Sequence, residues 1–60
     1  MVLINKTVEE ISSRGEFEIV AIERNDNTMM PLKDTKIKDN DTIYFSVLDE
    51  SIAKFKQTLY

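Results

Sequence analysis

The chain has to fold around a very small core, with no covalent or metal cross-link to hold it. It has 60 residues and contains neither cysteine nor histidine, so disulfides and zinc sites built from these ligands are excluded. Chains of this length bury only about 60% of their unfolded surface, which leaves a marginal core. We therefore expect one domain, spanning residues 1–60, that gains stability by docking on a larger protein or by self-association.

Charge and hydropathy narrow the classes of partner. The chain carries 11 acidic and 8 basic residues, a net charge of -3, which repels nucleic acid and anionic lipid at long range. Its apolar runs are shorter than a signal peptide or a membrane span requires, and the lack of cysteine fits a reducing compartment. We expect a cytoplasmic protein that binds no nucleic acid and does not insert into a membrane.

The acidic and hydroxyl residues do not form a recognisable catalytic or metal motif. Histidine and cysteine, the commonest general base and the thiol nucleophile, are absent. Asp39-Asn40-Asp41 begins like a calcium-binding loop, but Ile43 and a missing glycine break that pattern. Glu9-Glu10 fits the acidic start of a helix. The sequence therefore predicts a protein that is not an enzyme and has no metal site.

Short-range patterns predict the order strand, helix, strand, strand, strand, helix. The capping-box pattern Thr7-Val8-Glu9-Glu10 starts a helix of about two turns, which Gly15 ends. The other expected elements are strands at Val2–Ile4, Glu16–Arg24, Thr28–Met30 and Thr42–Leu48, and a final helix capped by Asp49 or Ser51. This order predicts an α+β fold: a small, mostly antiparallel sheet of three to four strands, with a short helix after the first strand and a C-terminal helix.

The predicted core joins the central strands to the last helix. Val20-Ala21-Ile22 is wholly apolar, so we expect this stretch to be covered on both faces of the sheet. Alternation within Thr42–Leu48 places every second apolar side chain on one face. One cluster is expected where the last helix covers the sheet, made of Ile19, Ala21, Ile43, Phe45, Val47, Ile52 and Phe55.

From Gly15 onward, short motifs follow one another in a recognisable order. They are a strand that ends in Ile-x-Arg, a polar turn, a proline, an Asp-Thr pair, an isolated apolar residue and an Asn-Asp-x-Ile strand. In this chain they occupy Glu18–Arg24, Asn25–Asn27, Pro31, Asp34-Thr35, Ile37 and Asn40–Phe45. Together with Leu3–Ile11 upstream, this order resembles the TrkA-C (RCK-C) domain family over nearly the whole chain.

Two features depart from the family pattern. Asn5 and Asn40 stand where the family has glycine, and asparagine is the best substitute at a positive φ. The first strand is truncated, which fits a trimmed piece of a longer chain or a naturally split subunit.

The resemblance implies regulation rather than catalysis. Domains of this family follow a Rossmann-like nucleotide-binding domain in cytosolic subunits that gate potassium channels and transporters. They form homodimers, and in some members the dimer cleft binds cyclic di-AMP. The implied partners are a second copy, a Rossmann-like domain or subunit, and a membrane channel or transporter subunit, to which the protein would be peripheral.

The resemblance also implies a ligand site at the end of the first helix and the start of the next strand. The ligand-binding residues expected there are Ile11, Ser12, Arg14, Glu18, Ile19 and Pro31. Family members that bind cyclic di-AMP have an arginine and an asparagine where this chain has Ser12 and Glu18. Because a carboxylate repels a diphosphate-like anion, cyclic di-AMP is expected to bind weakly or not at all, and no cofactor is assigned.

Two other interpretations stay open. The segment Asn40–Ile43 also resembles β-grasp sulfur-carrier and ubiquitin-like proteins, but those carriers end in Gly-Gly whereas this chain ends in Thr58-Leu59-Tyr60. A β-grasp fold also needs a hairpin before its helix, and the patterns predict none. The other alternative is a dimerisation module without a ligand, which differs only in whether the cleft is occupied.

Overall fold

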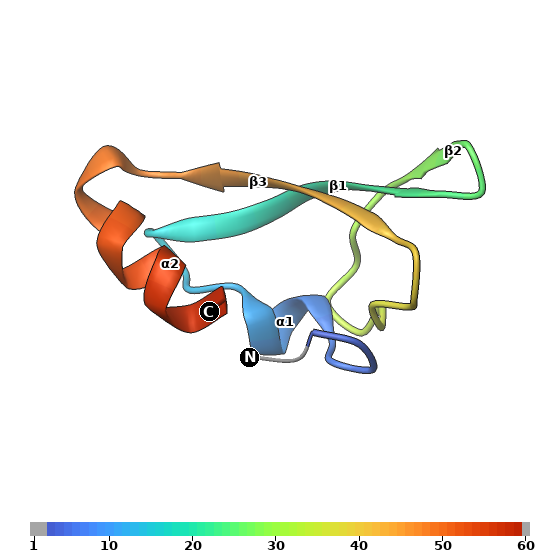
Figure 1. Ribbon diagram of the computed structural model, residues 1–60, viewed down its shortest axis with the longest axis horizontal. Coiled ribbons are helices and arrows are strands. Elements are labelled where there is room, and N and C mark those ends of the chain that lie inside the picture. The colour runs from blue at the N-terminus through green and yellow to red at the C-terminus, as the bar shows by residue number, and fades with distance from the viewer. Residues whose placement is uncertain (1–2, 60) are drawn as a thin grey trace.

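The computed structural model describes residues 3–59, which form one antiparallel sheet with helices on a single face (Figure 1). The elements are α1 (Val8–Ile11), β1 (Phe17–Arg24), β2 (Asn27–Met29), β3 (Thr42–Val47), a 3₁₀ turn η1 (Asp49–Ser51) and α2 (Ile52–Leu59). The strand order is β2-β1-β3. These elements confirm the predicted α+β class and its small antiparallel sheet. In Figure 1, α1 and α2 lie below the sheet, and its upper face is open.

The segment before α1 differs from the prediction. Leu3 and Ile4 lie in a loop and a turn rather than in a strand, and Val2 lies outside the described residues. The turn needs a left-handed residue, and Asn5 provides it with a φ of 71°. Asn40 likewise has a φ of 67°, so the expectation that asparagine takes over glycine's role at both positions is confirmed.

α1 begins where predicted but is shorter. The Thr7 hydroxyl accepts a hydrogen bond from the Glu10 N–H at 3.2 Å, and the Glu10 carboxylate accepts one from the Thr7 N–H at 3.1 Å, which confirms the capping box. The helix then ends at Ile11, because Ser12 has an extended backbone and Ser13 exchanges backbone hydrogen bonds with the first residue of β1. Gly15, at φ 80°, turns the chain between these partners and does not cap the helix.

A bulge in β1 changes which side chains face the core. The register of β1 with β3 shifts between Ile19 and Ala21, so Val20 is an extra residue. Such a residue breaks the strict alternation of inward and outward side chains. Ile19 and Ile22 are therefore both buried, while Val20 is 52% exposed. The expectation that Val20-Ala21-Ile22 is covered on both faces is wrong, since no described element covers the open face.

The core consists of two neighbouring groups rather than the single predicted cluster. The aliphatic group lies between α1 and the sheet and is made of Val8, Ile11, Ile19, Ile22 and Ile37. The aromatic group lies between α2 and the sheet: the Phe55 ring packs edge-on against Phe17 and Phe45, with centroid distances of 5.1 and 4.8 Å.

Alternation in β3 is confirmed, because Ile43, Phe45 and Val47 are more buried than their neighbours. Two other residues of the predicted cluster lie outside the buried core. Ile52, at the first turn of α2, is 41% exposed, and the bulge places Ala21 outside the aliphatic group.

Candidate functional site

A shallow hollow lies beside the end of α1 and the start of β1, where the sequence predicts the ligand site. Its volume is about 430 Å³. We call it the α1 hollow; its lining residues are Val8, Glu9, Ser12, Arg14, Glu18, Ile19 and Lys33.

The loop that follows β2 forms one wall of the α1 hollow because it is hydrogen-bonded to the start of α1. The Val8 N–H donates to the Thr35 carbonyl at 2.9 Å, and the Glu9 N–H donates to the Lys33 carbonyl at 3.2 Å. These N–H groups would otherwise be the unpaired donors of a helix start. Because the loop already uses these N–H groups, the polar groups that line the hollow belong to side chains rather than to the start of the helix backbone.

The structure brings together four of the predicted ligand residues: Ser12, Arg14, Glu18 and Ile19 all line the α1 hollow. Ile11 does not line it, because this side chain is 1% exposed and belongs to the aliphatic core. Pro31 also lies outside the lining residues.

The charges of the α1 hollow balance one another. Arg14 and Lys33 supply two positive groups, and Glu9 and Glu18 supply two negative ones. Arg14 is the only cation among the ligand residues that the resemblance implies, and Lys33 is a second cation that this expectation did not include. The hydrogen bonds that place Lys33 join segments far apart in the chain, and no local pattern around Pro31 or Asp34-Thr35 signals them.

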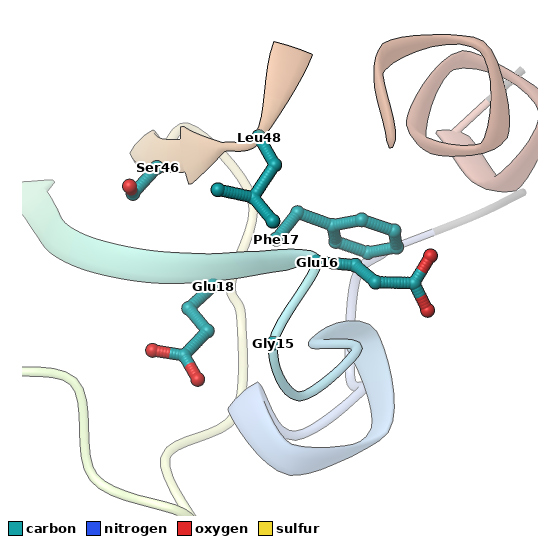
Figure 2. Close-up of a pocket in the computed structure, with 6 residues that line it drawn as sticks. All are labelled: Gly15, Glu16, Phe17, Glu18, Ser46 and Leu48. Atoms are coloured by element: carbon teal, nitrogen blue, oxygen red, sulfur yellow. The ribbon is translucent and has the colours of Figure 1, made fainter. Parts of the chain in front are cut away.

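A second, smaller hollow of about 210 Å³ lies between β1 and the end of β3 (Figure 2). Its lining residues are Gly15, Glu16, Phe17, Glu18, Ser46 and Leu48. Figure 2 shows the Leu48 side chain reaching toward Phe17, whereas the Glu18 carboxylate points away from both. Because its only charged lining residues are Glu16 and Glu18, this hollow does not suit an anion.

Glu16 is already engaged by its neighbours. Its carboxylate accepts hydrogen bonds from the Lys54 ammonium at 2.6 Å and from the Ser13 hydroxyl at 2.9 Å. These two bonds, the one from Lys54 first, lower the pKa of Glu16. Its contacts tie α2 to the start of β1, which is a structural role.

An ion pair between Arg24 and Asp41 lies at the end of β1 that is farther from α2. Asp41 accepts hydrogen bonds from the Nε and Nη2 atoms of Arg24 at 2.8 and 2.7 Å, and Arg24 also donates to the Lys36 carbonyl at 3.1 Å. The bond to Arg24 is the main reason that the pKa of Asp41 falls to about 2, although burial opposes it. The pair fixes the loop before β3 against the end of β1.

The family model described as the TrkA-C domain matches residues 2–60. The chain belongs to the TrkA-C domain family. This match confirms the resemblance, and TrkA-C domains are regulatory domains of potassium-transport proteins rather than catalytic ones. No curated protein and no solved structure gives a significant match to this chain.

The structure gives different roles to two TrkA-C motif residues and to the charged residues of the α1 hollow. The arginine of Ile-x-Arg and the aspartate of Asn-Asp bind each other as Arg24 and Asp41, so these motif residues hold the fold. The residues of the α1 hollow differ, because the side chains of Arg14, Glu18 and Lys33 have no ion-pair partner among residues 3–59. Their charged groups therefore do not hold the described part of the fold together through ion pairs.

The described residues show neither a metal cluster nor a membrane span. No group of three or more acidic side chains within residues 3–59 is arranged to hold a metal ion. In the same part of the chain, no helix is long and apolar enough to cross a membrane.

Proposed function

We propose that this TrkA-C domain senses a ligand and dimerises, as the non-catalytic part of a cytoplasmic subunit that controls potassium transport. The α1 hollow carries the proposal: a serine hydroxyl, an apolar wall and two cations without an ion-pair partner among residues 3–59 converge there. Such convergence of a few polar groups on an apolar wall is typical of ligand sites. The domain would act beside a Rossmann-like nucleotide-binding domain and a membrane transporter or channel subunit.

The charges of the α1 hollow set limits on its ligand. Arg14 and Lys33 favour an anionic group, and the Ser12 hydroxyl supplies a further donor. Glu9 and Glu18 repel the same anion, so a small or zwitterionic ligand suits the hollow better than a cyclic dinucleotide with two phosphates. The unmodified chain should therefore bind cyclic di-AMP weakly or not at all.

Isothermal calorimetry with cyclic di-AMP tests this account of the site. The unmodified chain should give no sub-micromolar binding, whereas Glu18→Asn combined with Ser12→Arg should bind more tightly. Glu23→Asn is the matched control, because it removes a carboxylate from β1 outside the hollow and should leave binding unchanged. Sub-micromolar binding by the unmodified chain would show that Glu18 does not oppose the ligand.

Sedimentation equilibrium tests the second part of the proposal. A 60-residue domain without cross-links gains stability from association, so we expect a homodimer at micromolar concentration. A folded monomer at that concentration would refute it. A dimer that binds neither nucleotides nor small anions would instead support the alternative of a dimerisation module without a ligand.

The topology argues against the β-grasp alternative. A β-grasp domain needs a hairpin that leads into its helix, but within residues 3–59 all three strands follow α1. The chain also continues from β3 into α2, whereas a sulfur carrier needs a free, extended end after its last strand.

A further inference from the structure

The two edges of the sheet differ in how well they are protected against pairing with another strand. On one side, β2 covers only Ile22–Arg24 of β1 and has 3 residues, and Pro31 follows it closely; short edge strands and proline both block pairing. The rest of β1 on that side is interrupted by the bridge from Ser13 to Phe17 and by the bulge at Val20, and bulges also hinder pairing. β3 forms the other edge and has 6 residues, Thr42–Val47. None of them is charged, and none is proline or glycine. Natural proteins seldom leave such an edge uncovered.

The backbone groups that face outward from β3 can be identified. The Leu48 N–H donates to the Glu16 carbonyl at 2.9 Å, so Leu48 directs its backbone toward β1. Alternate residues of an antiparallel strand direct their backbone groups to opposite sides. The bulge adds its extra residue to β1, so this alternation continues unbroken along β3. Ile43, Phe45 and Val47 therefore direct their N–H and C=O groups to the free edge.

These outward groups have no partner inside the described part of the molecule. The alternation directs the backbone groups of Ile43, Phe45 and Val47 away from β1, and no loop, turn or side-chain hydrogen bond among residues 3–59 reaches them. The free edge thus offers three donors and three acceptors in a row, at the spacing that a further antiparallel strand requires.

We propose that β3 pairs antiparallel with β3 of a second copy of this chain, across a two-fold axis at Phe45. This inference rests on the homodimer of the proposed function and names the surface that forms it. In this register Phe45 lies opposite Phe45 of the other copy, and Ile43 lies opposite Val47. Every outward N–H and C=O of β3 then has a partner. Residues directly opposite share a face, so the helices of both copies lie on one side of the joined sheet.

Two features favour a second copy as the occupant. β3 contains no charged residue, so two identical β3 strands can lie side by side without electrostatic repulsion. The register also brings Asp49 of one copy opposite Asp41 of the other, and Arg24 already neutralises Asp41. Other registers serve the edge less well. A slip of one residue places side chains that point toward the core opposite side chains that point away from it. An axis at Tyr44 leaves the outward N–H and C=O groups of Val47 without a partner in β3 of the other copy.

Disulfide trapping tests this register, because the natural chain has no cysteine. Tyr44 and Ser46 lie directly opposite across the proposed interface as a pair without mutual hydrogen bonds. The Cα atoms of such a pair are about 4.5 Å apart, a distance that a disulfide can span. Tyr44→Cys and Ser46→Cys are prepared on copies with different affinity tags, mixed and oxidised. Both positions are exposed, and circular dichroism verifies that each variant folds.

The mixture should give the Tyr44→Cys/Ser46→Cys heterodimer as the main cross-linked species. Tyr44→Cys alone should cross-link several-fold less, because two copies of residue 44 are diagonal neighbours about 7–8 Å apart. The matched control mixes Tyr44→Cys with Thr28→Cys, an exposed position on β2, and should stay at background.

Three outcomes overturn the inference in distinguishable ways. If sedimentation shows a dimer but the mixture cross-links no more than the Thr28→Cys control, the dimer uses another surface. More efficient cross-linking of Tyr44→Cys alone than of the mixture would place the axis at Tyr44 and refute the proposed register. A folded monomer in sedimentation would remove both the pairing and the homodimer of the proposed function.

Discussion

The half of the molecule beneath α1 and the half beneath α2 are built differently. Under α1, Ile11 is 1% exposed and Ile22 is 0% exposed, and the nearby loop is fixed by the ion pair of Arg24 and Asp41. Under α2, Phe55 provides the only aromatic ring that joins the helix to the sheet among residues 3–59. No residue of α2 is fully buried.

This difference shows where a small domain can stand alone and where it needs a partner. The α1 half satisfies its own polar groups through the capping box, the ion pair and the hydrogen bonds to the loop. The edge of β3 is open along both halves, since Ile43 lies opposite Ile22 and Val47 lies opposite Phe17. The α2 half also leaves the Ile52 side chain exposed. Stability is distributed unevenly in such folds, so we expect the α1 half to resist unfolding and the β3–α2 half to gain from dimerisation.

The largest difference should come from truncating one isoleucine in each half. Ile22→Ala removes a fully buried side chain and leaves a cavity, so it should destabilise the domain by about 2–5 kcal/mol. This loss is enough to unfold a marginal domain. Ile52→Ala, at a position that is 41% exposed, should have a much smaller effect. Thermal melts of both variants measure the difference, and equal losses of stability would refute the unequal halves.

The second largest effect should be the loss of folding stability at acidic pH that comes from the Arg24–Asp41 ion pair. The pKa of Asp41 is lowered from 3.8 to about 2 in the folded chain. Its contribution to stability is therefore complete above pH 3.8 and is lost as the pH falls toward 2. Asp41→Asn should flatten the loss of stability across this acidic range. Asp49→Asn, at an exposed carboxylate beyond the other end of β3, is the control, and an equal flattening there would refute the role of the pair.

A smaller effect is expected from the helix cap. Thr7→Ala should destabilise the domain by about 1 kcal/mol, because it removes the hydroxyl that accepts from the start of α1. Thr58→Ala is the matched control in α2: the Thr58 hydroxyl donates to the Lys54 carbonyl at 3.0 Å, a bond that contributes little to a helix. Urea titrations should show a clear shift for the first variant and almost none for the second.

The smallest effect should come from the pair of Lys54 and Glu16. The Lys54 side chain is 55% exposed and that of Glu16 is 35% exposed, and exposed ion pairs contribute little to stability because solvent and salt screen them. Lys54→Ala should therefore cost less than Thr7→Ala, and high salt should remove the difference from the unmodified chain. A loss that persists at high salt would mean that α2 depends on this contact more than its exposure implies.

Local patterns predicted those elements that depend on neighbouring residues. The capping box of Thr7 and Glu10 and the left-handed turns at Asn5 and Asn40 need only a few adjacent residues, and all are confirmed. The bulge at Val20 could not be predicted, because it depends on the register of β1 against β3 rather than on any local signal. The early end of α1 at Ile11 has the same origin, since Ser13 pairs with the start of β1.

The candidate site could be predicted in part. Likeness to the TrkA-C family pointed to the end of the first helix and the start of the next strand, and Ser12, Arg14, Glu18 and Ile19 do lie together there. Lys33 could not be found in this way, because long-range hydrogen bonds place its loop beside α1. Ile11 was expected in the site, but its position on α1 directs its side chain into the aliphatic core.

Amide hydrogen exchange of the unmodified chain tests most directly whether pairing completes the β3 half. The exchange rates of Ile43, Phe45 and Val47 should be compared at a dilute concentration and at one where sedimentation shows the dimer. We predict that these three amides exchange slowly only in the dimer, whereas those of Tyr44 and Ser46, which face β1, are protected at both concentrations. Rapid exchange of the three outward amides in the dimer would contradict the account.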